Sequence, residues 1–208
     1  FRENAEKFNV SMVLAPDYRH LEDGSPDPAD YHRFVAACER DTVVVLSRNL
    51  YRPFALFPVQ GSMGGAAFIS IQFVLVRGAE FLGYNLLHEL GHAIGGLADE
   101  YVELGRGTRN IANAPNCAPD LQTAKQRWGG LVGIRGVDFY TGVAGIEGTK
   151  YYKSPYVSFP ELPPAPDGSD MGDGGCSYDW KNIRPTAGSI MKNQFETQYD
   201  FGPVNERA

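Results

Sequence analysis

Residues 86–101 read Leu-Leu-His-Glu-Leu-Gly-His-Ala-Ile-Gly-Gly-Leu-Ala-Asp-Glu-Tyr, and this stretch is the most informative part of the chain. His88 and His92 are four residues apart, so on a helix they lie one above the other on the same face. Two imidazoles placed in this way can share one zinc ion. Glu89 lies beside them, where its carboxylate can reach a zinc-bound water. The pattern predicts a zinc site with a general base next to it.

Apolar residues around the motif predict that it lies on an amphipathic helix. They recur at steps of three and four residues, which gives a buried stripe, and both histidines fall on the other face. An alternative interpretation is that the histidines are surface residues of a core helix. The sequence that follows the motif weighs against that alternative. The residues of the stripe are Leu82, Leu86, Leu90, Ala93 and Leu97.

A catalytic zinc needs at least one more protein ligand, and an acid after the helix is the natural candidate. Asp99 follows His88 by eleven residues, which in an unbroken helix is about 16 Å along the axis and too far to share a metal. The chain must therefore turn, and Gly95-Gly96 supplies the break. Asp99 is the expected third ligand and Glu100 is its main competitor. Both acids could instead cap or solvate the helix end.

The motif resembles that of the metzincin clan of zinc peptidases, His-Glu-x-x-His-x-x-Gly-x-x-His followed by a methionine turn. The chain departs from it at Ala98, where the third histidine would stand, and an acid follows at Asp99. This variant is similar to the IgA-peptidase family of bacterial metallopeptidases. The resemblance places the third metal ligand at Asp99 and not at Glu100.

Other blocks extend the resemblance over most of the chain. Residues 1–10 are similar to the family's opening strand, residues 184–191 resemble its methionine turn, and residues 201–205 resemble the segment after that turn. The resemblance implies a secreted, zinc-dependent endopeptidase with Met191 as the apolar floor beneath the metal. It implies no particular substrate, and immunoglobulin A as substrate does not follow.

We expect one catalytic domain over residues 1–208, an α/β (α+β) fold of the zincin or metzincin-like kind. The N-terminal half, residues 1–97, should hold a twisted mixed sheet and two long helices. The C-terminal half, residues 98–208, is rich in Gly, Pro, Asn and Tyr and has no long periodic stretch, which predicts loops. An active-site cleft is expected between the halves, with the motif helix as its floor.

Local patterns give the expected elements of the N-terminal half. Alternation of apolar residues predicts a half-buried strand over residues 8–14, and β-branched runs predict a buried strand over 42–46 and a further strand over 66–76. Asp27-Pro28 offers a helix cap and a first-turn proline, and helical spacing follows it.

The charge and hydropathy of the chain restrict the classes of partner that we expect it to bind. The net charge of −6 and the pI near 5.2 argue against nucleic-acid binding, and no apolar run reaches the length of a membrane span. The resemblance implies a protein or peptide substrate. The chain begins at Phe1 without a signal-peptide pattern, so we expect a mature or excised domain. The resemblance implies that it is secreted or extracellular, either alone or as part of a larger cell-surface or periplasmic chain.

The three cysteines of the chain leave open whether it contains a disulfide bond. Cys38 lies in an apolar helical pattern and is most simply a small core residue. Cys117 and Cys176 lie in loop-like sequence and could pair in an oxidising compartment, or all three could stay reduced.

Several other residues are weaker candidates for a metal-binding or catalytic role. Three loop acids, Asp167, Asp170 and Asp173, could hold calcium, but their spacing matches no EF-hand and solvated acids are the better interpretation. The sequence does not choose which tyrosine could donate a hydrogen bond to a tetrahedral intermediate; the candidates are Tyr101, Tyr151 and Tyr152. The other two histidines, His20 and His32, have no ligand-like spacing.

The motif predicts peptide-bond hydrolysis, with Glu89 as the general base that takes a proton from zinc-activated water. One alternative is an inactive zinc-binding recognition module on the same fold, and the intact Glu89 speaks against it. Another is a structural or adhesive protein in which the motif is accidental. A protein of that kind would bind no stoichiometric zinc.

Overall fold

A small mixed sheet and a sixteen-residue helix organise the N-terminal half of the protein. The structure is a computed structural model, and all statements below concern the residues that it describes. These are residues 11–36, 42–56, 65–72, 80–102, 110–152, 175–192 and 200–208.

The sheet has three strands in the order β1-β3-β2. The central strand β3 (Ala66–Ser70) runs parallel to β1 (Val43–Ser47) and antiparallel to β2 (Phe54–Leu56). All five residues of β3 are buried, because this strand has a partner on each side and is covered by a helix. A central apolar strand of this kind fixes the position of whatever packs on it.

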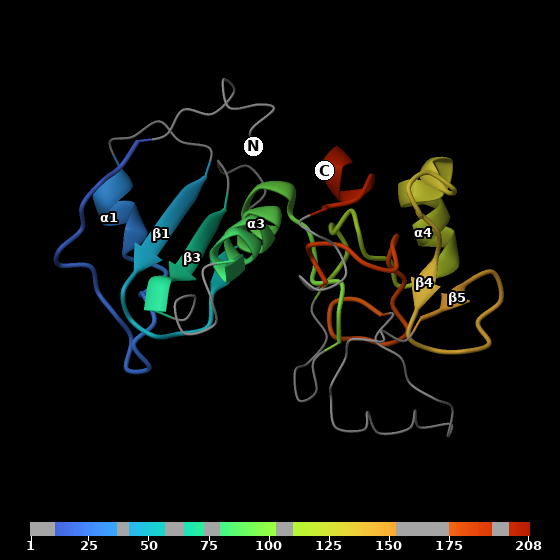
Figure 1. Ribbon diagram of the computed structural model, residues 1–208, viewed down its shortest axis with the longest axis horizontal. Coiled ribbons are helices and arrows are strands. Elements are labelled where there is room, and N and C mark those ends of the chain that lie inside the picture. The colour runs from blue at the N-terminus through green and yellow to red at the C-terminus, as the bar shows by residue number, and fades with distance from the viewer. Residues whose placement is uncertain are drawn as a thin grey trace.

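Helix α3 (Glu80–Gly95) carries the His-Glu-x-x-His motif and packs on β3 and β2. Its C-terminal turn is tied to the start of β3, where the Gly65 N–H donates to the Ala93 carbonyl at 2.7 Å. A Cβ atom on Gly65 would lie 2.1 Å from the Leu56 carbonyl oxygen, so only glycine permits this approach. Figure 1 shows α3 between the sheet and the loop-rich half of the molecule.

The C-terminal half consists of short helices and strands joined by loops. They pack on a core that includes Trp128, Phe139, Ile183 and Val204. Asp120 caps α4 by accepting a hydrogen bond from the Thr123 N–H at 2.7 Å. The elements are α4 (Leu121–Trp128), η2 (Gly129–Leu131), the parallel pair β4 (Tyr140–Thr141) and β5 (Lys150–Tyr151), and η3 (Asn205–Arg207).

The architecture is therefore mixed α and β, with a small mixed sheet and few helices, as expected at that level. The pair of long helices expected in the N-terminal half is not shown. Helix α3 is long, but the other described helix there, α1 (Tyr31–Val35), has five residues. The α1 helix begins after Asp30 and not after Asp27, because the Asp27 carboxylate instead accepts from the Ala29 N–H in a preceding turn. Cys38 lies outside the described residues.

Three strand predictions need correction. Residues 11–15 form no strand, and Met12 and Leu14 are 86% and 82% exposed, so the described part of the predicted strand over 8–14 is not half-buried. Strand β1 is not buried either, because Val44 and Leu46 on one of its faces are exposed. Strand β3 ends at Ser70, where a helical turn begins, so the strand predicted to reach residue 76 is shorter.

Candidate metal centre

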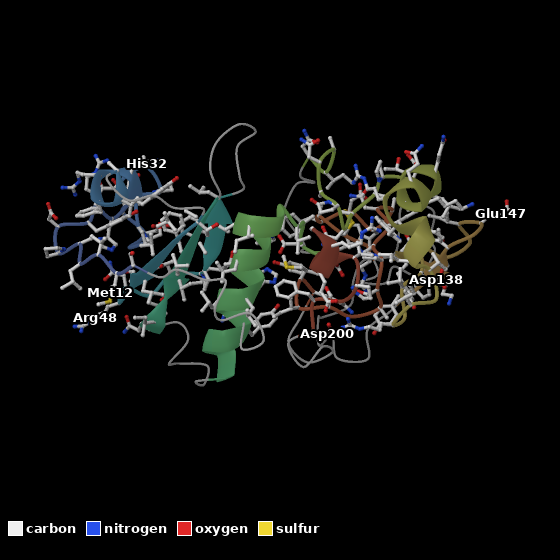
Figure 2. All side chains as sticks on the ribbon, turned by 90° about the horizontal axis from the view of Figure 1, so that it is seen from above. Met12, His32, Arg48, Asp138, Glu147 and Asp200 are labelled. Atoms are coloured by element: carbon white, nitrogen blue, oxygen red, sulfur yellow. A yellow bond between two sulfur atoms is a disulfide. The ribbon has the colours of Figure 1, made fainter. Side chains whose placement is uncertain are left out.

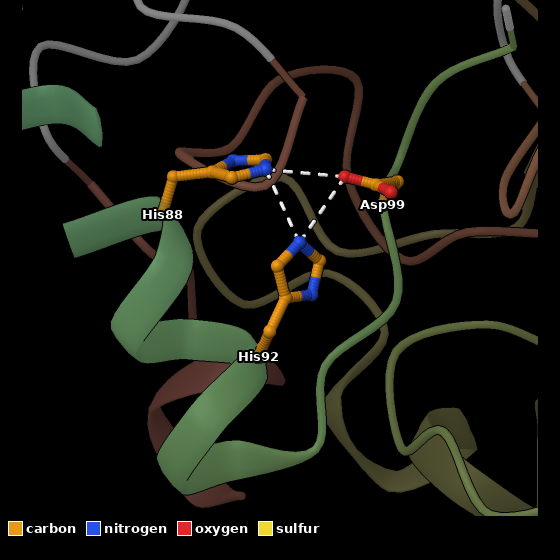
Figure 3. A group of neighbouring side chains, drawn as sticks. All are labelled: His88, His92 and Asp99. Atoms are coloured by element: carbon orange, nitrogen blue, oxygen red, sulfur yellow. Dashed lines mark hydrogen bonds and ion pairs between the residues drawn. The ribbon is translucent and has the colours of Figure 1, made fainter. Parts of the chain in front are cut away.

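Three side chains converge at the junction of the two halves: His88 and His92 from α3, and Asp99 from the segment that follows it (Figure 3). The Nε2 atoms of the two histidines are 3.2 Å apart. The Asp99 Oδ1 atom lies 3.1 Å from Nε2 of His88 and 3.3 Å from Nε2 of His92. All three residues are buried.

The bend predicted between the second histidine and the acid is present at the glycine pair. Helix α3 ends at Gly95, and Gly96 has a φ of +59°, in the left-handed region that glycine reaches without strain. The Leu97 carbonyl turns back and accepts a hydrogen bond from Nδ1 of His92. The same turn that brings Asp99 to the histidines therefore also orients one of them.

Hydrogen bonds on the far side of each imidazole determine what faces the cluster. Nδ1 of His88 lies 2.9 Å from the Ile190 carbonyl oxygen, and Nδ1 of His92 faces the Leu97 carbonyl. A carbonyl can only accept, so both Nδ1 atoms donate, and in a neutral imidazole the Nε2 atom then carries a lone pair. Two lone pairs and a carboxylate oxygen thus point at one another, and this arrangement requires a proton or a cation between them.

The spacing fits a tetrahedral metal. Two ligand atoms about 2.05 Å from a tetrahedral zinc are about 3.3 Å apart. The three separations in the cluster are 3.2, 3.1 and 3.3 Å, which is one face of such a tetrahedron. A buried group of two imidazoles and one carboxylate can hold a metal ion, and the fourth corner of the tetrahedron is not supplied by these three residues.

The electrostatics of the cluster also favour a positive charge. Burial acts to lower the pKa of His88, but its hydrogen bond with Asp99 and the nearby carboxylates raise it to about 9. Burial acts to raise the pKa of the Asp99 carboxyl, but the charges and hydrogen bonds of His92 and His88 hold it well below its usual range. The site therefore retains a cation at pH values where an isolated histidine would be neutral.

Glu89 is buried beside the three candidate ligands and does not belong to the group that could share an ion. Burial raises the pKa of its carboxyl, while the neighbouring imidazoles of His88 and His92 oppose that rise. A carboxylate in this setting accepts a proton more readily than one in water, which suits a general base.

Glu100, the competing candidate for third ligand, is turned away from the histidines. Its side chain is completely buried and accepts hydrogen bonds from four neutral side chains. The donors are Ser189 at 2.7 Å, Asn116 and Asn205 at 2.9 Å each, and Thr186 at 3.4 Å. Asp99 and Glu100 are adjacent in the chain, yet the first faces the cluster and the second holds the loops of the C-terminal half together.

The segment that resembles a methionine turn lies under the motif helix. Met191 is completely buried, and a Cβ atom on Gly91 would lie 2.5 Å from its sulfur, so the methionine packs closely on α3 between the two histidines. The preceding residue, Ile190, supplies the carbonyl that orients His88. Met191 therefore packs on the motif helix, in one buried cluster with Leu97 and Ile190.

Of the three tyrosines considered for the oxyanion, only Tyr101 is near the cluster. Its ring centroid is 6.3 Å from that of His88, and its hydroxyl accepts a hydrogen bond from Arg52 at 3.1 Å. Tyr151 lies exposed on β5, and the Tyr152 ring lies against Lys192 and Arg184.

The remaining candidates lie elsewhere in the chain. Nε2 of His20 is 3.4 Å from the Ser47 hydroxyl, and His32 lies at the outer end of the sheet-bearing half, away from α3 (Figure 2). The three loop acids considered for calcium, Asp167, Asp170 and Asp173, lie outside the described residues. Cys117 and Cys176 form a disulfide, one of the two alternatives that the sequence left open.

Two residues near the cluster were missed by sequence reasoning. The Tyr178 hydroxyl donates to Asp99 Oδ2 at 2.6 Å, and the Asn116 side chain pairs with both backbone groups of Ala98, at 2.8 and 2.9 Å. Neither has a motif around it. The only signal in the sequence was position, since Asn116 precedes Cys117 and Tyr178 follows Cys176 by two residues.

Comparison of the chain with protein-family models, with curated proteins and with solved structures finds no match. The case for function therefore rests on the residues of the cluster and on the sequence motif.

Proposed function

We propose that the protein is a zinc-dependent endopeptidase and that His88, His92 and Asp99 hold one catalytic zinc ion. The observation that carries the proposal is the buried triangle of three ligand atoms, 3.1 to 3.3 Å apart, with Glu89 next to it. Each imidazole already donates its other nitrogen to a backbone carbonyl, as zinc-binding histidines do in proteins.

Zinc bound at this site would lower the pKa of a coordinated water and polarise the scissile carbonyl. The contributions of the chain follow from its geometry. Glu89 accepts the proton of the attacking water and passes it to the leaving amine. The Ile190 and Leu97 carbonyls keep both imidazoles in the tautomer that presents Nε2, and Met191 supports the helix turn between them.

The substrate class follows from charge and from the site. The net charge of −6 argues against nucleic acid as a substrate, and from the proposed zinc peptidase site we infer a protein or peptide substrate. Among the described residues, no helix is long and apolar enough to cross a membrane. A disulfide is compatible with an oxidising compartment, and we propose a secreted or extracellular location.

A peptide library tests the function. Wild-type protein should cleave internal peptide bonds, a chelator should stop the cleavage, and added zinc should restore it. The Glu89→Gln variant, whose amide cannot accept the proton, should bind zinc like wild type and cleave about 10²- to 10⁴-fold more slowly.

Two outcomes would contradict the proposal in different ways. Stoichiometric zinc without cleavage in wild type would indicate a recognition module on the same fold. Cleavage by Glu89→Gln at the wild-type rate would mean that the assigned base is wrong.

A further inference from the structure

The Asp99 carboxylate has one oxygen facing the histidines and the other facing Tyr178. Oδ1 lies within 3.3 Å of both Nε2 atoms, whereas Oδ2 accepts the Tyr178 hydroxyl hydrogen bond at 2.6 Å. Tyr178 is buried, and its ring also lies 5.7 Å from the ring of Tyr101. The hydroxyl therefore occupies the oxygen that a metal in the cluster would otherwise be able to share.

We propose that Tyr178 is a positioning residue that makes Asp99 a ligand through one oxygen only. The inference rests on the proposed zinc site. With Oδ2 held by the hydroxyl, the carboxylate presents Oδ1 alone, and the fourth corner of the metal stays available for water. Hydrogen-bond partners of metal ligands fix ligand orientation in this way and contribute to metal affinity.

The backbone around Tyr178 is shaped for this contact at a local cost. Ser177 and Tyr178 have φ values of +51° and +65°, and the Asp179 N–H donates to the Cys176 carbonyl across them at 3.1 Å. Two central residues with positive φ are typical of a type I′ turn, for which Asn-Gly is the favoured sequence. A Ser-Tyr turn is strained by comparison, and strain of this kind gathers at functional sites.

The turn delivers two contacts to Asp99 and one to Tyr101, two residues further along the chain. The Ser177 N–H donates to the Asp99 carbonyl at 2.8 Å, and the Tyr178 N–H donates to the Tyr101 carbonyl at 3.2 Å. Backbone and side chain of the turn thus fix both the main chain and the carboxylate of Asp99. A turn that served only to reverse the chain would need neither contact.

A second segment, which contains Asn116, holds the backbone on the N-terminal side of Asp99. Asn116 makes two hydrogen bonds with the backbone of Ala98, directly before Asp99. The disulfide between Cys117 and Cys176 joins this segment to the turn, and both cysteines pack in one buried cluster with Ala98. The residues before and after Asp99 are therefore held by two segments that are covalently linked to each other.

A merely structural tyrosine would act differently from a positioning residue. Loss of a buried hydroxyl from packing alone would lower the stability of the fold and leave the metal's ligands unchanged. Loss of the hydroxyl that holds Oδ2 would free the carboxylate to rotate or to bind through both oxygens. The two roles are separated by the metal's own spectrum and affinity.

The experiment compares wild type, Tyr178→Phe and the matched control Tyr18→Phe, whose lost hydroxyl donates to the Asp27 carbonyl in the sheet-bearing half and not to Asp99. Zinc affinity is measured by competition with a chromophoric chelator, and Co²⁺ substituted for zinc is followed by its visible absorption. We expect Tyr178→Phe to bind zinc about 10- to 100-fold more weakly, while Tyr18→Phe stays within about twofold of wild type. Tetrahedral Co²⁺ absorbs more strongly than five-coordinate Co²⁺, so Tyr178→Phe should also show weaker absorption.

Affinity and spectrum unchanged in Tyr178→Phe would overturn the inference, and so would an equal loss in both variants. Failure of wild type to bind zinc at all would instead overturn the proposed function. Infrared difference spectra of wild type with labelled aspartate give a second readout without any variant, because the carboxylate stretches report how many oxygens bind. Binding through two oxygens in wild type would contradict the role of Tyr178.

Discussion

The candidate metal centre joins two regions that are built in different ways. In α3, His88 and His92 are placed by four-residue spacing on one helix, and a local turn orients His92 through the Leu97 carbonyl. In the loop-rich half, Asp99 is placed by partners far away in sequence. Tyr178 is 79 residues from Asp99, and the donors to the adjacent Glu100 include Asn205, which is 105 residues away.

Because the two regions are held in different ways, damage to each should affect the metal site differently. The helix depends on short-range hydrogen bonds and on packing against the sheet, so it should keep its two histidines in place when the loops are disturbed. The loop region depends on a buried hydrogen-bond network and a disulfide. Damage there should reach the metal through the third ligand, while damage to the helix should remove the metal directly.

The largest effect should come from the helix. His92→Ala removes one of two ligands on α3 and should abolish stoichiometric zinc binding and cleavage. His20→Ala is the matched control, because this histidine faces Ser47 and lies outside the cluster. Metal analysis of both purified variants checks the prediction. Full zinc occupancy in His92→Ala would contradict the assignment of His92 as a metal ligand.

Removal of the disulfide should have the largest effect on the stability of the loop region. Cys117 and Cys176 are 59 residues apart, and a bridge closing a loop of that length is worth about 4 kcal/mol by restricting the unfolded chain. Denaturant unfolding of the double variant Cys117→Ala/Cys176→Ala should show a loss of that size.

Mass spectrometry of an unreduced digest tests the bridge itself and should show the linked peptides. Alkylation of both cysteines without prior reduction would refute the bridge and, with it, the link between the two segments that hold Asp99.

The two adjacent acids should give opposite results. Asp99→Asn replaces a carboxylate ligand with an amide and should weaken zinc binding about 100-fold. Glu100→Gln should keep zinc but lower the free energy of unfolding by about 2 kcal/mol, because its amide group cannot accept from all four buried donors. If Glu100→Gln loses zinc and Asp99→Asn does not, the third ligand is Glu100 and not Asp99.

The same contrast explains what could be predicted from the sequence. Helix α3, its end at the glycine pair and the two histidines follow from periodicity and local turn chemistry. The contacts of Tyr178 and Asn116 do not, because they join segments 79 and 18 residues apart in loops without periodic pattern. The resemblance pointed to Asp99 as the ligand, but the buried hydrogen bonds of Glu100 were out of reach, since three of its four donors lie 86 to 105 residues away in the chain.

Errors in the sheet have a related cause. A β-branched run predicted a buried strand over residues 42–46, but burial of both faces depends on what the rest of the chain places there. In the structure Val44 and Leu46 are exposed, so β1 is only half-buried. The helix predicted after Asp27 is present as α1 but begins later, after Asp30, because Asp27 caps a preceding turn.

A smaller effect should appear in the pH dependence of the protein after chelation. The pKa of His88 in the folded protein is raised to about 9, above the value of about 6.5 in an unfolded chain. The stability it contributes is therefore fully present below pH 6.5 and is lost as the pH rises through 9. Between pH 7 and pH 9 we expect a loss of about 2 kcal/mol in the free energy of unfolding.

His88→Asn is the control for that measurement, because it removes the titrating group while leaving the rest of α3. Urea unfolding of both chelated proteins across the pH range should show the decline in wild type only. A decline of equal size in His88→Asn would assign the pH dependence to other groups.

X-ray absorption at the zinc edge of the purified wild-type protein tests the central claim most directly. We predict one zinc per chain, with two imidazole nitrogens at about 2.0–2.1 Å, oxygen ligands at about 2.0–2.2 Å and no sulfur at about 2.3 Å. This ligand set corresponds to His88, His92, Asp99 and a water. Absence of stoichiometric zinc, or a first shell with sulfur or without imidazole, would contradict the account.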